Sequence, residues 1–279
     1  MANTYKKEEL ERLHAELYDI LQEIIRVCDK HRIPYVVIAG SAIGAFFEEA
    51  ILPWDDDIDI AMKRADYNRF LEVAPAELRE GYFLQWLETD PHTPFYFAKV
   101  RKEGTLFVEK EFVQLPMHQG IFIDVFPFDK VPDTPWLQKA QRVAANFLNC
   151  CFMGKEVWFW RYFGHPTTDT PTNRGPLPCL MNRIVDTLFT KRAIYRMLSA
   201  VQGMFNGRQT NYYNMVLMPR DHIAVESFDN PQAMPFGPLT PLFPSDVEVY
   251  LRHHYPRLRR YIPEEEQANH RPVTLKFGD

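Results

Sequence analysis

The acidic run PWDDDIDI, from residue 53 to residue 60, places four aspartates within five positions: Asp55, Asp56, Asp57 and Asp59. Negative charges this close repel one another, so a run of this kind usually accompanies a bound cation. Apolar residues alternate with the last two aspartates, which predicts a strand over residues 58–62 that carries Asp57 and Asp59 on one face. Asp55 joins that face if the strand extends further back. Carboxylate oxygens are ligands that Mg²⁺ or Mn²⁺ prefers, so the run predicts a metal site; the alternative is a solvated acidic turn.

Gly40 and Ser41 directly follow a short apolar run at residues 35–39, which is typical of a buried strand. A glycine at this point lets the backbone approach a phosphate closely. The Ser41 hydroxyl and the first N–H groups of a helix beginning at Ala42 could then bind phosphate oxygens. A Gly-Ser pair alone is more often a simple turn, but together with Asp57 and Asp59 it predicts a phosphate-handling site.

Asp124 is the one carboxylate inside the apolar run GIFIDVF at residues 120–126. A buried carboxylate is costly unless it is paired with a cation or bound to a metal. Asp124 is therefore either a third metal ligand, a general base, or the partner of a buried arginine.

Periodicity predicts the elements that position these residues. Helices are expected over 6–30, 64–74, 135–163, 181–204 and 245–255, and the first turns of another over 42–49. Strands are expected over 35–39, 58–62, 82–86, 95–101, 105–108 and 120–126, the last as a central strand. A turn at Gly104 would pair the strand 95–101 with 105–108. Ser245 and Glu248 form a capping-box signature at the start of the last helix.

The composition is that of a globular protein with 279 residues, 46% hydrophobic residues and a net charge of −5. A nucleic-acid partner would call for a basic excess, so none is expected. The four cysteines show no metal-binding spacing and are expected to be reduced thiols. The N-terminus is charged and no run of about 18 apolar residues occurs, so we expect a cytoplasmic protein that spans no membrane.

Three segments of the chain resemble the LicD family of phosphorylcholine-type transferases, which is related to the fukutin group. The segments are residues 40–62, 118–133 and 244–255, and Lys99–Thr105 (KVRKEGT) is similar as well. The Pro-Trp-Asp-x-Asp-x-Asp element is the most specific of these matches, whereas residues 135–219 match poorly.

The resemblance implies an α/β (α+β) fold with a nucleotidyltransferase-like core, a mixed β-sheet and a mostly helical remainder. The core would comprise residues 1–133 and the remainder residues 134–279, packed on the core or continuous with it. Asp57, Asp59 and Asp124 would hold Mg²⁺, with Asp55 nearby, and Gly40 and Ser41 would hold the donor phosphate.

The resemblance also implies a reaction: transfer of a phospho-alcohol such as phosphocholine from a CDP-activated donor to a hydroxyl of a cell-surface glycan precursor. Metal ions would clamp the donor diphosphate, and Asp124 would help take the proton of the hydroxyl. Choline, ethanolamine, ribitol and glycerol all remain open as the alcohol. The alternatives are a nucleotidyltransferase that moves NMP from an NTP, and a catalytically lapsed nucleotide- or glycan-binding module.

One departure from the family pattern concerns charge. The family usually has a basic pair and a glycine between the Gly-Ser turn and the Trp-Asp element, where this chain has Phe47, Glu48 and Ala50. Lys99 or Arg101 could supply the missing positive charge to the donor, or both could be surface cations.

Three further features are candidates for substrate contacts. His118 precedes the strand of Asp124 and could hydrogen-bond the acceptor or a phosphate. Trp54 and the aromatic run at 95–97 could form a wall for a quaternary ammonium, although core packing is the commoner role of such residues. Trp158 and Trp160, in an aromatic cluster, could rest on a membrane surface if the glycan acceptor is lipid-linked; a core helix is the alternative.

Overall fold

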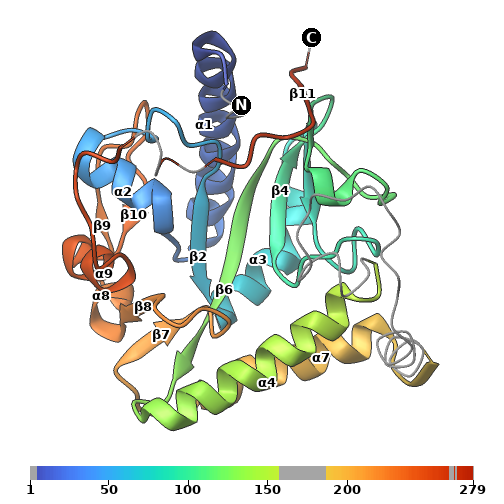
Figure 1. Ribbon diagram of the computed structural model, residues 1–279, viewed down its shortest axis with the longest axis vertical. Helices are drawn as coiled ribbons and strands as arrows, with labels where there is room; N and C mark the ends of the chain where they lie inside the picture. The colour runs from blue at the N-terminus through green and yellow to red at the C-terminus, as the bar shows by residue number, and fades with distance from the viewer. Residues whose placement is uncertain (1–4, 157–186, 264–266, 268, 279) are drawn as a thin grey trace.

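The structure is a computed structural model that describes residues 5–156, 187–263, 267 and 269–278 (Figure 1). Its helices are α1 Lys7–His31, α2 Ala39–Glu48, α3 Arg64–Glu77, α4 Pro135–Met153, α7 Lys191–Gln202, α8 Val225–Asp229 and α9 Val247–His254. Its strands are β1 Val36–Val37, β2 Asp59–Lys63, β3 Tyr82–Gln85, β4 Ala98–Lys102, β5 Leu106–Val108, β6 Phe122–Val131, β7 Tyr212–Asn214, β8 His222–Ala224, β9 Gln232–Ala233, β10 Leu242–Phe243 and β11 Thr274–Lys276. The fold is a mixed α/β arrangement, as predicted.

A seven-stranded mixed sheet with β6 at its centre organises the molecule. The main order is β1-β2-β6-β4-β3, and β7 pairs with the far end of β6 and with β8. Strands β2 and β6 run parallel, whereas β4 pairs with β6 and with β3 in the antiparallel sense. The prediction that residues 120–126 lie in a central strand is therefore confirmed, although β6 begins at Phe122 and extends to Val131.

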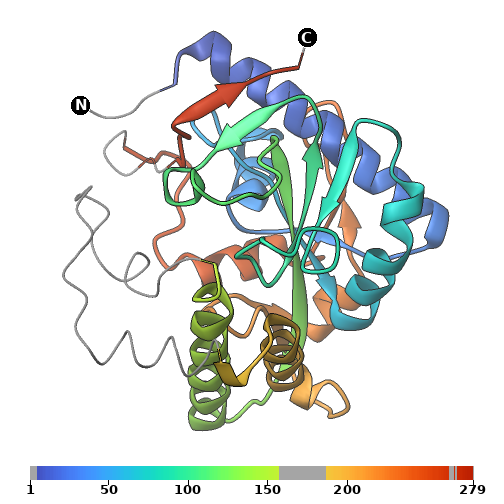
Figure 2. The same cartoon turned by 90° about the vertical axis from the view of Figure 1, so that its right-hand side faces the viewer.

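Helices α1 and α3 cover one face of this sheet (Figures 1 and 2). Helix α1 buries a stripe of apolar side chains at helical spacing, including Leu13, Leu17, Ile20 and Ile24. From β2 the side chains of Ile60 and Met62 are fully buried as well. Burial of each such side chain stabilises the fold by about 1.5–3 kcal/mol. The alternating apolar residues predicted for β2 therefore determine which face of this strand is turned toward the core.

Residues after 133 complete the same sheet and core. Strand β7 pairs with Asp129–Val131 of β6, and the main apolar cluster includes Ile223, Phe243 and Leu251. Helices α4 and α7 lie side by side at the foot of the sheet (Figure 1) and enclose a second apolar cluster around Phe152 and Leu198. The helix expected at 135–163 is observed as α4, which already ends at Met153, and the helix expected at 181–204 is observed as α7, which begins only at Lys191. Residues 157–163 and 181–186 of these ranges lie outside the described residues, and so do Trp158 and Trp160, the candidates for a membrane contact.

The predicted pairing of residues 105–108 with the strand before Gly104 is wrong. Strand β5 pairs instead with β11, near the end of the described chain. Strand β4 already hydrogen-bonds to β3 on one edge and to β6 on the other, so it has no free edge for a further strand. Gly104 does form a turn, with φ of 74°, but the turn leads away from the sheet.

The predicted capping box at Ser245 and Glu248 is also wrong. Helix α9 begins at Val247 after the N-cap residue Asp246, and no side chain caps it. Ser227 takes over part of this role, because its carbonyl accepts the Ser245 N–H and its hydroxyl accepts the Asp246 N–H at 3.0 Å.

Two smaller expectations concern cysteines and the membrane. Cys28, Cys150 and Cys151 are free thiols, and Cys179 lies outside the described residues. Among the residues that the structure describes, no helix has the length and apolar character needed to cross a bilayer.

Candidate active site

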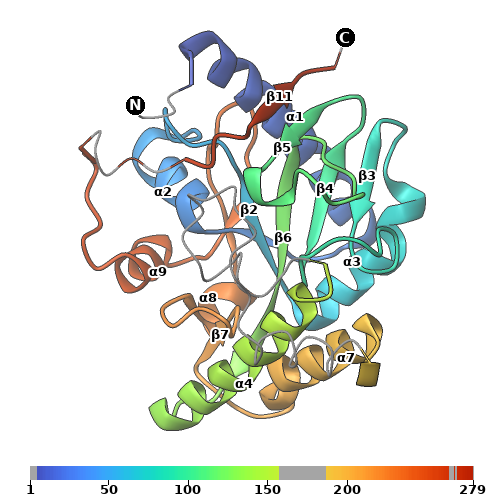
Figure 3. The same cartoon turned by 45° about the vertical axis from the view of Figure 1, so that its right-hand side comes forward.

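A row of three charged side chains crosses the centre of the sheet. The parallel register of β2 and β6 places Asp59 opposite Asp124, and the antiparallel register of β4 and β6 places Lys99 opposite the same Asp124. Directly opposed residues on neighbouring strands extend to the same face. Strands β2, β6 and β4 lie side by side (Figure 3), and their register brings together three residues that the sequence placed in separate motifs.

Lys99 forms an ion pair with Asp124 rather than facing solvent. Its Nζ lies 2.7 Å from Asp124 Oδ1, and its side chain is only 3% exposed. The ammonium also lies 3.5 Å from the ring centroid of Phe122 and 4.3 Å from that of Phe95. Aromatic faces attract cations, so these rings and Asp124 together hold the ammonium in place. The aromatic run at 95–97 thus contacts a cation, but this cation is the protein's own Lys99.

The carboxylates outnumber this one ammonium. Burial raises the pKa of Asp59 well above its usual range, and the negative charges of Asp57, Asp124 and Asp55 raise it further. Burial raises the pKa of Asp124 to about 6, against the opposing effect of Lys99. Burial and the charges of Asp57 and Asp56 likewise raise the pKa of Asp55. The site is short of positive charge, which is the condition under which a divalent cation binds most favourably.

The carboxylates are of the chemical type that a hard divalent ion prefers, although no three of the four proposed ligands have oxygens within 4.8 Å of one another. Asp55, Asp57, Asp59 and Asp124 offer only carboxylate oxygens, and no described side chain donates a hydrogen bond to the Asp59 carboxylate. Oxygen ligands of this kind are the preferred partners of Mg²⁺. Strand β2 begins at Asp59 rather than at Ile58, so Asp55 and Asp57 lie in the loop before it and not on the strand itself. Ligands on a loop can rotate toward an ion that Asp59 and Asp124 hold from rigid strands.

Helix α2 fixes the loop and the strand from one side. The helix begins at Ala39, three residues earlier than expected, so Gly40 and Ser41 form its first turn. The Ser41 hydroxyl is buried and accepts the N–H of Asp59 at 3.1 Å. A Cβ on Gly40 would lie 2.7 Å from Asp55 Oδ2, closer than real Cβ contacts. Gly40 therefore makes room for the Asp55 carboxylate, and Ser41 positions the start of β2.

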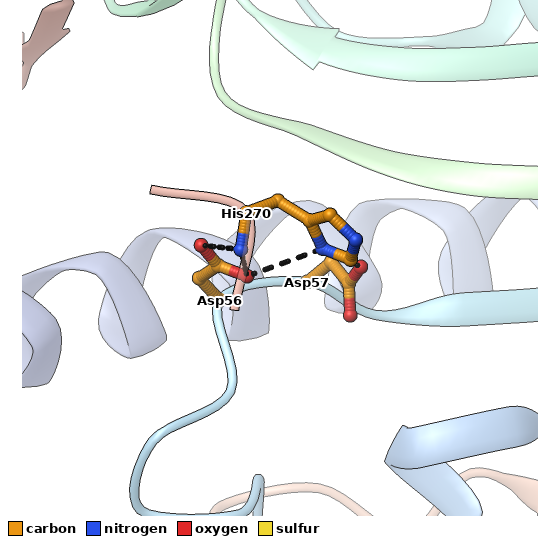
Figure 4. A group of neighbouring side chains, drawn as sticks. All are labelled: Asp56, Asp57 and His270. Atoms are coloured by element: carbon orange, nitrogen blue, oxygen red, sulfur yellow. Dashed lines mark hydrogen bonds and ion pairs between the residues drawn. The ribbon is translucent and has the colours of Figure 1, made fainter. Parts of the chain in front are cut away.

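Among the described residues, one group of three potential metal ligands has its ligand atoms within 4.8 Å of one another. The group is Asp56, Asp57 and His270 (Figure 4). The Asp56 carboxylate already accepts hydrogen bonds from the Tyr5 hydroxyl at 2.7 Å and from the His270 N–H. Hydrogen bonds to Asp56 and Asp57 raise the pKa of His270 to about 11, so its ring is a cation at neutral pH. We interpret this group as an anchor that joins both ends of the chain to the acidic loop.

Arg101 lies opposite Phe122 on the neighbouring strand, two residues along β4 from Lys99. Arg101 is 1% exposed and donates to Gln85 Oε1 and to the Gly120 carbonyl, each at 2.6 Å. Its guanidinium lies 4.8 Å from the centroid of the Phe122 ring, which also contacts Lys99 and Phe107. His118 stacks on Phe83 and its Nδ1 accepts the Gly120 N–H. Both side chains are held within the β3–β4 region. Trp54 is half-buried and packs against the main core.

Sequence reasoning missed a buried network that holds the start of α2. The Ala39 N–H donates to the Tyr250 hydroxyl at 3.0 Å, and this hydroxyl donates to Asp221 Oδ1 at 3.1 Å. His254 Nδ1 also lies 2.9 Å from Asp221 Oδ1. Ala39 has a positive φ of 52°, which costs energy for a residue with a side chain and needs such support. The only signal in the sequence was a single acid, Asp221, before the short apolar run at 222–224.

Comparisons with known proteins identify the family. Residues 32–171 match the family model described as LicD/FKTN/FKRP, nucleotidyltransferase domain. The chain is 25% identical over 285 residues to the lipopolysaccharide cholinephosphotransferase LicD of Haemophilus influenzae, with 95% of this chain and 97% of that protein covered. Uncharacterized proteins of Rickettsia typhi and Rickettsia prowazekii are 29% and 27% identical over 72 and 70 residues, about a quarter of each chain. The chain belongs to the LicD family.

Proposed function

We propose that this protein transfers phosphocholine from a CDP-activated donor to a hydroxyl of a cell-surface glycan precursor, in a reaction that depends on Mg²⁺ or Mn²⁺. The observation that carries the proposal is the placement of Asp59 and Asp124 side by side on adjacent strands, with Asp55 and Asp57 close enough to raise the pKa of Asp59. The phosphocholine assignment is supported by the relative from Haemophilus influenzae, which aligns over nearly the whole of both chains.

Asp57, Asp59 and Asp124 would hold the metal, with Asp55 beside them. When bound, the ion would neutralise charge on the donor diphosphate and on the transferred phosphorus. The chain's own groups set the geometry: strands β2 and β6 fix Asp59 and Asp124, and the Ser41 hydroxyl fixes the backbone of Asp59. Substrate positioning on rigid strands is what makes an in-line displacement efficient.

Asp124 also serves as the general base in this proposal. Without a bound ion, burial raises the pKa of Asp124 to about 6, against the opposing effect of Lys99. A carboxylate oxygen that does not contact the ion can accept the proton of the hydroxyl. The acceptor hydroxyl gives its proton to this carboxylate while its oxygen bonds to the phosphorus that bears choline. The bond from that phosphorus to the bridging oxygen breaks, and CMP leaves with the bridging oxygen. Lys99 holds Asp124 in place from the neighbouring strand.

A labelled donor tests the transfer. The purified protein is incubated with Mg²⁺, lipopolysaccharide that lacks phosphocholine, and CDP-choline labelled either in the choline or in the cytidine. The proposal predicts that the choline label enters the lipopolysaccharide and that the cytidine label appears only as CMP. Cytidine label on the glycan, or pyrophosphate release from an NTP with acceptor, would instead indicate nucleotidyl transfer.

A further inference from the structure

A pocket of about 560 Å³ opens beside helix α2, at the end of α9. It is lined by Ile43 of α2, by Arg220, by the run from His254 to Arg259 and by Ile262. Helices α2 and α9 lie next to each other (Figure 3). The pocket is therefore formed where the C-terminal part of the chain meets the helix that carries Gly40 and Ser41. Pockets of about 300–1,000 Å³ are the usual size for small-molecule sites.

The lining is strongly basic in a protein whose net charge is −5. Arg220 and Arg257 are exposed at the pocket, and neither forms a hydrogen bond or ion pair with any residue that the structure describes. Arg259 and His254 line the pocket as well. By contrast, neighbouring Arg260 pairs with Glu48 of α2 at 3.2 Å, which fastens this segment to the helix. Guanidinium groups are well suited to bind phosphate oxygens in pairs, so the pocket is equipped for an anionic ligand.

The rest of the lining suits a nucleoside. Ile43, Tyr255, Leu258 and Ile262 provide apolar and aromatic surface beside the arginines. A nucleoside phosphate likewise has two parts: a flat base, which stacks on apolar and aromatic surface, and phosphates, which need cations. The pocket therefore combines the two kinds of contact that a nucleotide requires.

The pocket also adjoins the carboxylates. Ile43 lies two residues after Ser41, whose hydroxyl holds the backbone of Asp59. Gly40, three residues before Ile43 on the same helix, packs so closely on Asp55 that a Cβ would lie 2.7 Å from its Oδ2. A ligand in this pocket can therefore extend a phosphate toward the proposed metal ligands.

We propose that this pocket binds the nucleotide half of the donor, with Arg220 and Arg257 on its phosphate oxygens and the apolar wall against its nucleoside. The inference rests on the proposed function, because it takes a CDP-alcohol as the donor. It assigns binding of the leaving CMP to the C-terminal segment, whereas the carboxylates of β2 and β6 act on the transferred phosphorus.

Titration calorimetry with CDP in EDTA tests the pocket without the metal. We expect Arg220→Ala and Arg257→Ala each to weaken CDP binding about tenfold, because each removes one charged hydrogen-bond donor. Arg257→Lys should recover part of the loss. Arg252→Ala is the matched control: Arg252 lies on α9 and pairs with Glu248, outside the pocket lining, so its removal should leave CDP affinity unchanged. Wild-type affinity in both alanine variants, or no CDP binding by the wild type, would overturn the inference.

The same variants separate this inference from the proposed function. If both hold, the alanine variants should transfer phosphocholine with a raised KM for CDP-choline. Transfer with an unchanged KM would remove the pocket assignment and leave the transferase intact. If the wild type binds CDP through Arg220 and Arg257 but transfers no phosphocholine, the pocket stands as a nucleotide site and the proposed reaction is wrong.

Discussion

Lys99 and Asp124 form a nearly buried ion pair next to three further carboxylates. A buried pair contributes little net stability, but loss of one partner leaves the other charge without compensation. The pair has a second consequence in this protein. The Lys99 ammonium balances only part of the negative charge of the neighbouring carboxylates, so the remaining charge can still attract a divalent ion. The pair therefore sets both the position and the residual charge of the proposed metal site.

Replacement of Lys99 tests this role. We expect Lys99→Met to lower the free energy of unfolding by about 3 kcal/mol, since the Asp124 carboxylate would remain buried beside Asp59 without its cation. The double variant Lys99→Met/Asp124→Asn should recover much of that loss in urea titrations, because the uncompensated charge is gone. Additive losses in the double variant would contradict the assigned pairing.

Pattern alone identified Asp57, Asp59 and Asp124 as candidate ligands, because acids within apolar alternation are costly and therefore conspicuous. Pattern could not show that Lys99 faces Asp124, since this depends on the register between strands that are distant in sequence. The same limit hid the Asp221–Tyr250 contact, which joins residues 29 positions apart. The pattern also gave no sign that Gly40 makes room for Asp55, because this close approach joins residues 15 positions apart.

At the scale of elements, helix α2 carries two glycines with different neighbours. A Cβ on Gly40 would meet the Asp55 carboxylate, whereas a Cβ on Gly44 would lie 2.3 Å from the Ala50 carbonyl oxygen. A side chain can rotate away from a new methyl group, but backbone packed against a helix cannot. Substitution of Gly40 should therefore affect the site, whereas substitution of Gly44 should affect the fold.

We expect Gly40→Ala to reduce kcat about 10²-fold by displacing the Asp55 carboxylate, with little change in the thermal midpoint. Gly44→Ala should instead lower the free energy of unfolding by about 1–3 kcal/mol. Steady-state kinetics and thermal unfolding of the same two preparations check both expectations. A Gly40→Ala enzyme with wild-type kcat would show that the close approach to Asp55 has no catalytic consequence.

Helix α1 depends on Glu23 for its contact with the segment after α3. The Glu23 side chain is fully buried and accepts hydrogen bonds from Arg26 and from the backbone and side chain of Arg79. Burial raises the pKa of Glu23, but these hydrogen bonds outweigh burial and hold it below its usual value. A carboxyl with a lowered pKa stabilises the fold above its unfolded-state pKa and loses this contribution as the pH falls through the folded-state value.

Glu23→Gln should therefore lower the free energy of unfolding by about 1–3 kcal/mol at neutral pH. The difference from wild type should shrink below about pH 4.3, the ordinary pKa of a glutamate. Urea titrations over this pH range measure the effect, with the exposed Glu8→Gln as control. A difference that is constant with pH would show that charge on Glu23 is not the cause.

On the scale of the whole molecule, the family-matched segment and the C-terminal segment share one sheet and one core. Strand β7 pairs with β6, and Ile223, Phe243 and Leu251 complete the main apolar cluster. Residues near both ends of the chain also come together, because Asp56 binds both Tyr5 and His270. Periodicity predicted most individual elements, but these long-range pairings lay beyond it because the apolar pattern does not specify partners.

We predict that a fragment of residues 1–133 does not fold alone, because it would expose the edge of β6 at residues 129–131 and lose the buried side chains supplied by β8, β10 and α9. The intact chain should unfold in one cooperative transition through this shared core. Circular dichroism of the fragment and calorimetry of the whole chain check this. A fragment with a cooperative thermal transition would contradict it.

The C-terminal segment also contacts the region of Phe47 and Glu48, where the chain departs from the family pattern. Arg260 pairs with Glu48, and the proposed nucleotide pocket draws its arginines from Arg220 and the residues after α9. In this account the C-terminal segment supplies cations for the donor, while the sheet supplies carboxylates for the metal.

Release of CMP from CDP-choline tests the central claim most directly. The wild type is compared with Asp59→Asn in the presence of acceptor, with Mg²⁺ and with EDTA. The account predicts CMP formation by the wild type only with Mg²⁺, and a rate about 10³-fold lower in Asp59→Asn, because one carboxylate of the metal site is lost. CMP formation that is unaffected by EDTA or by Asp59→Asn would contradict a metal-dependent transferase built on Asp59 and Asp124.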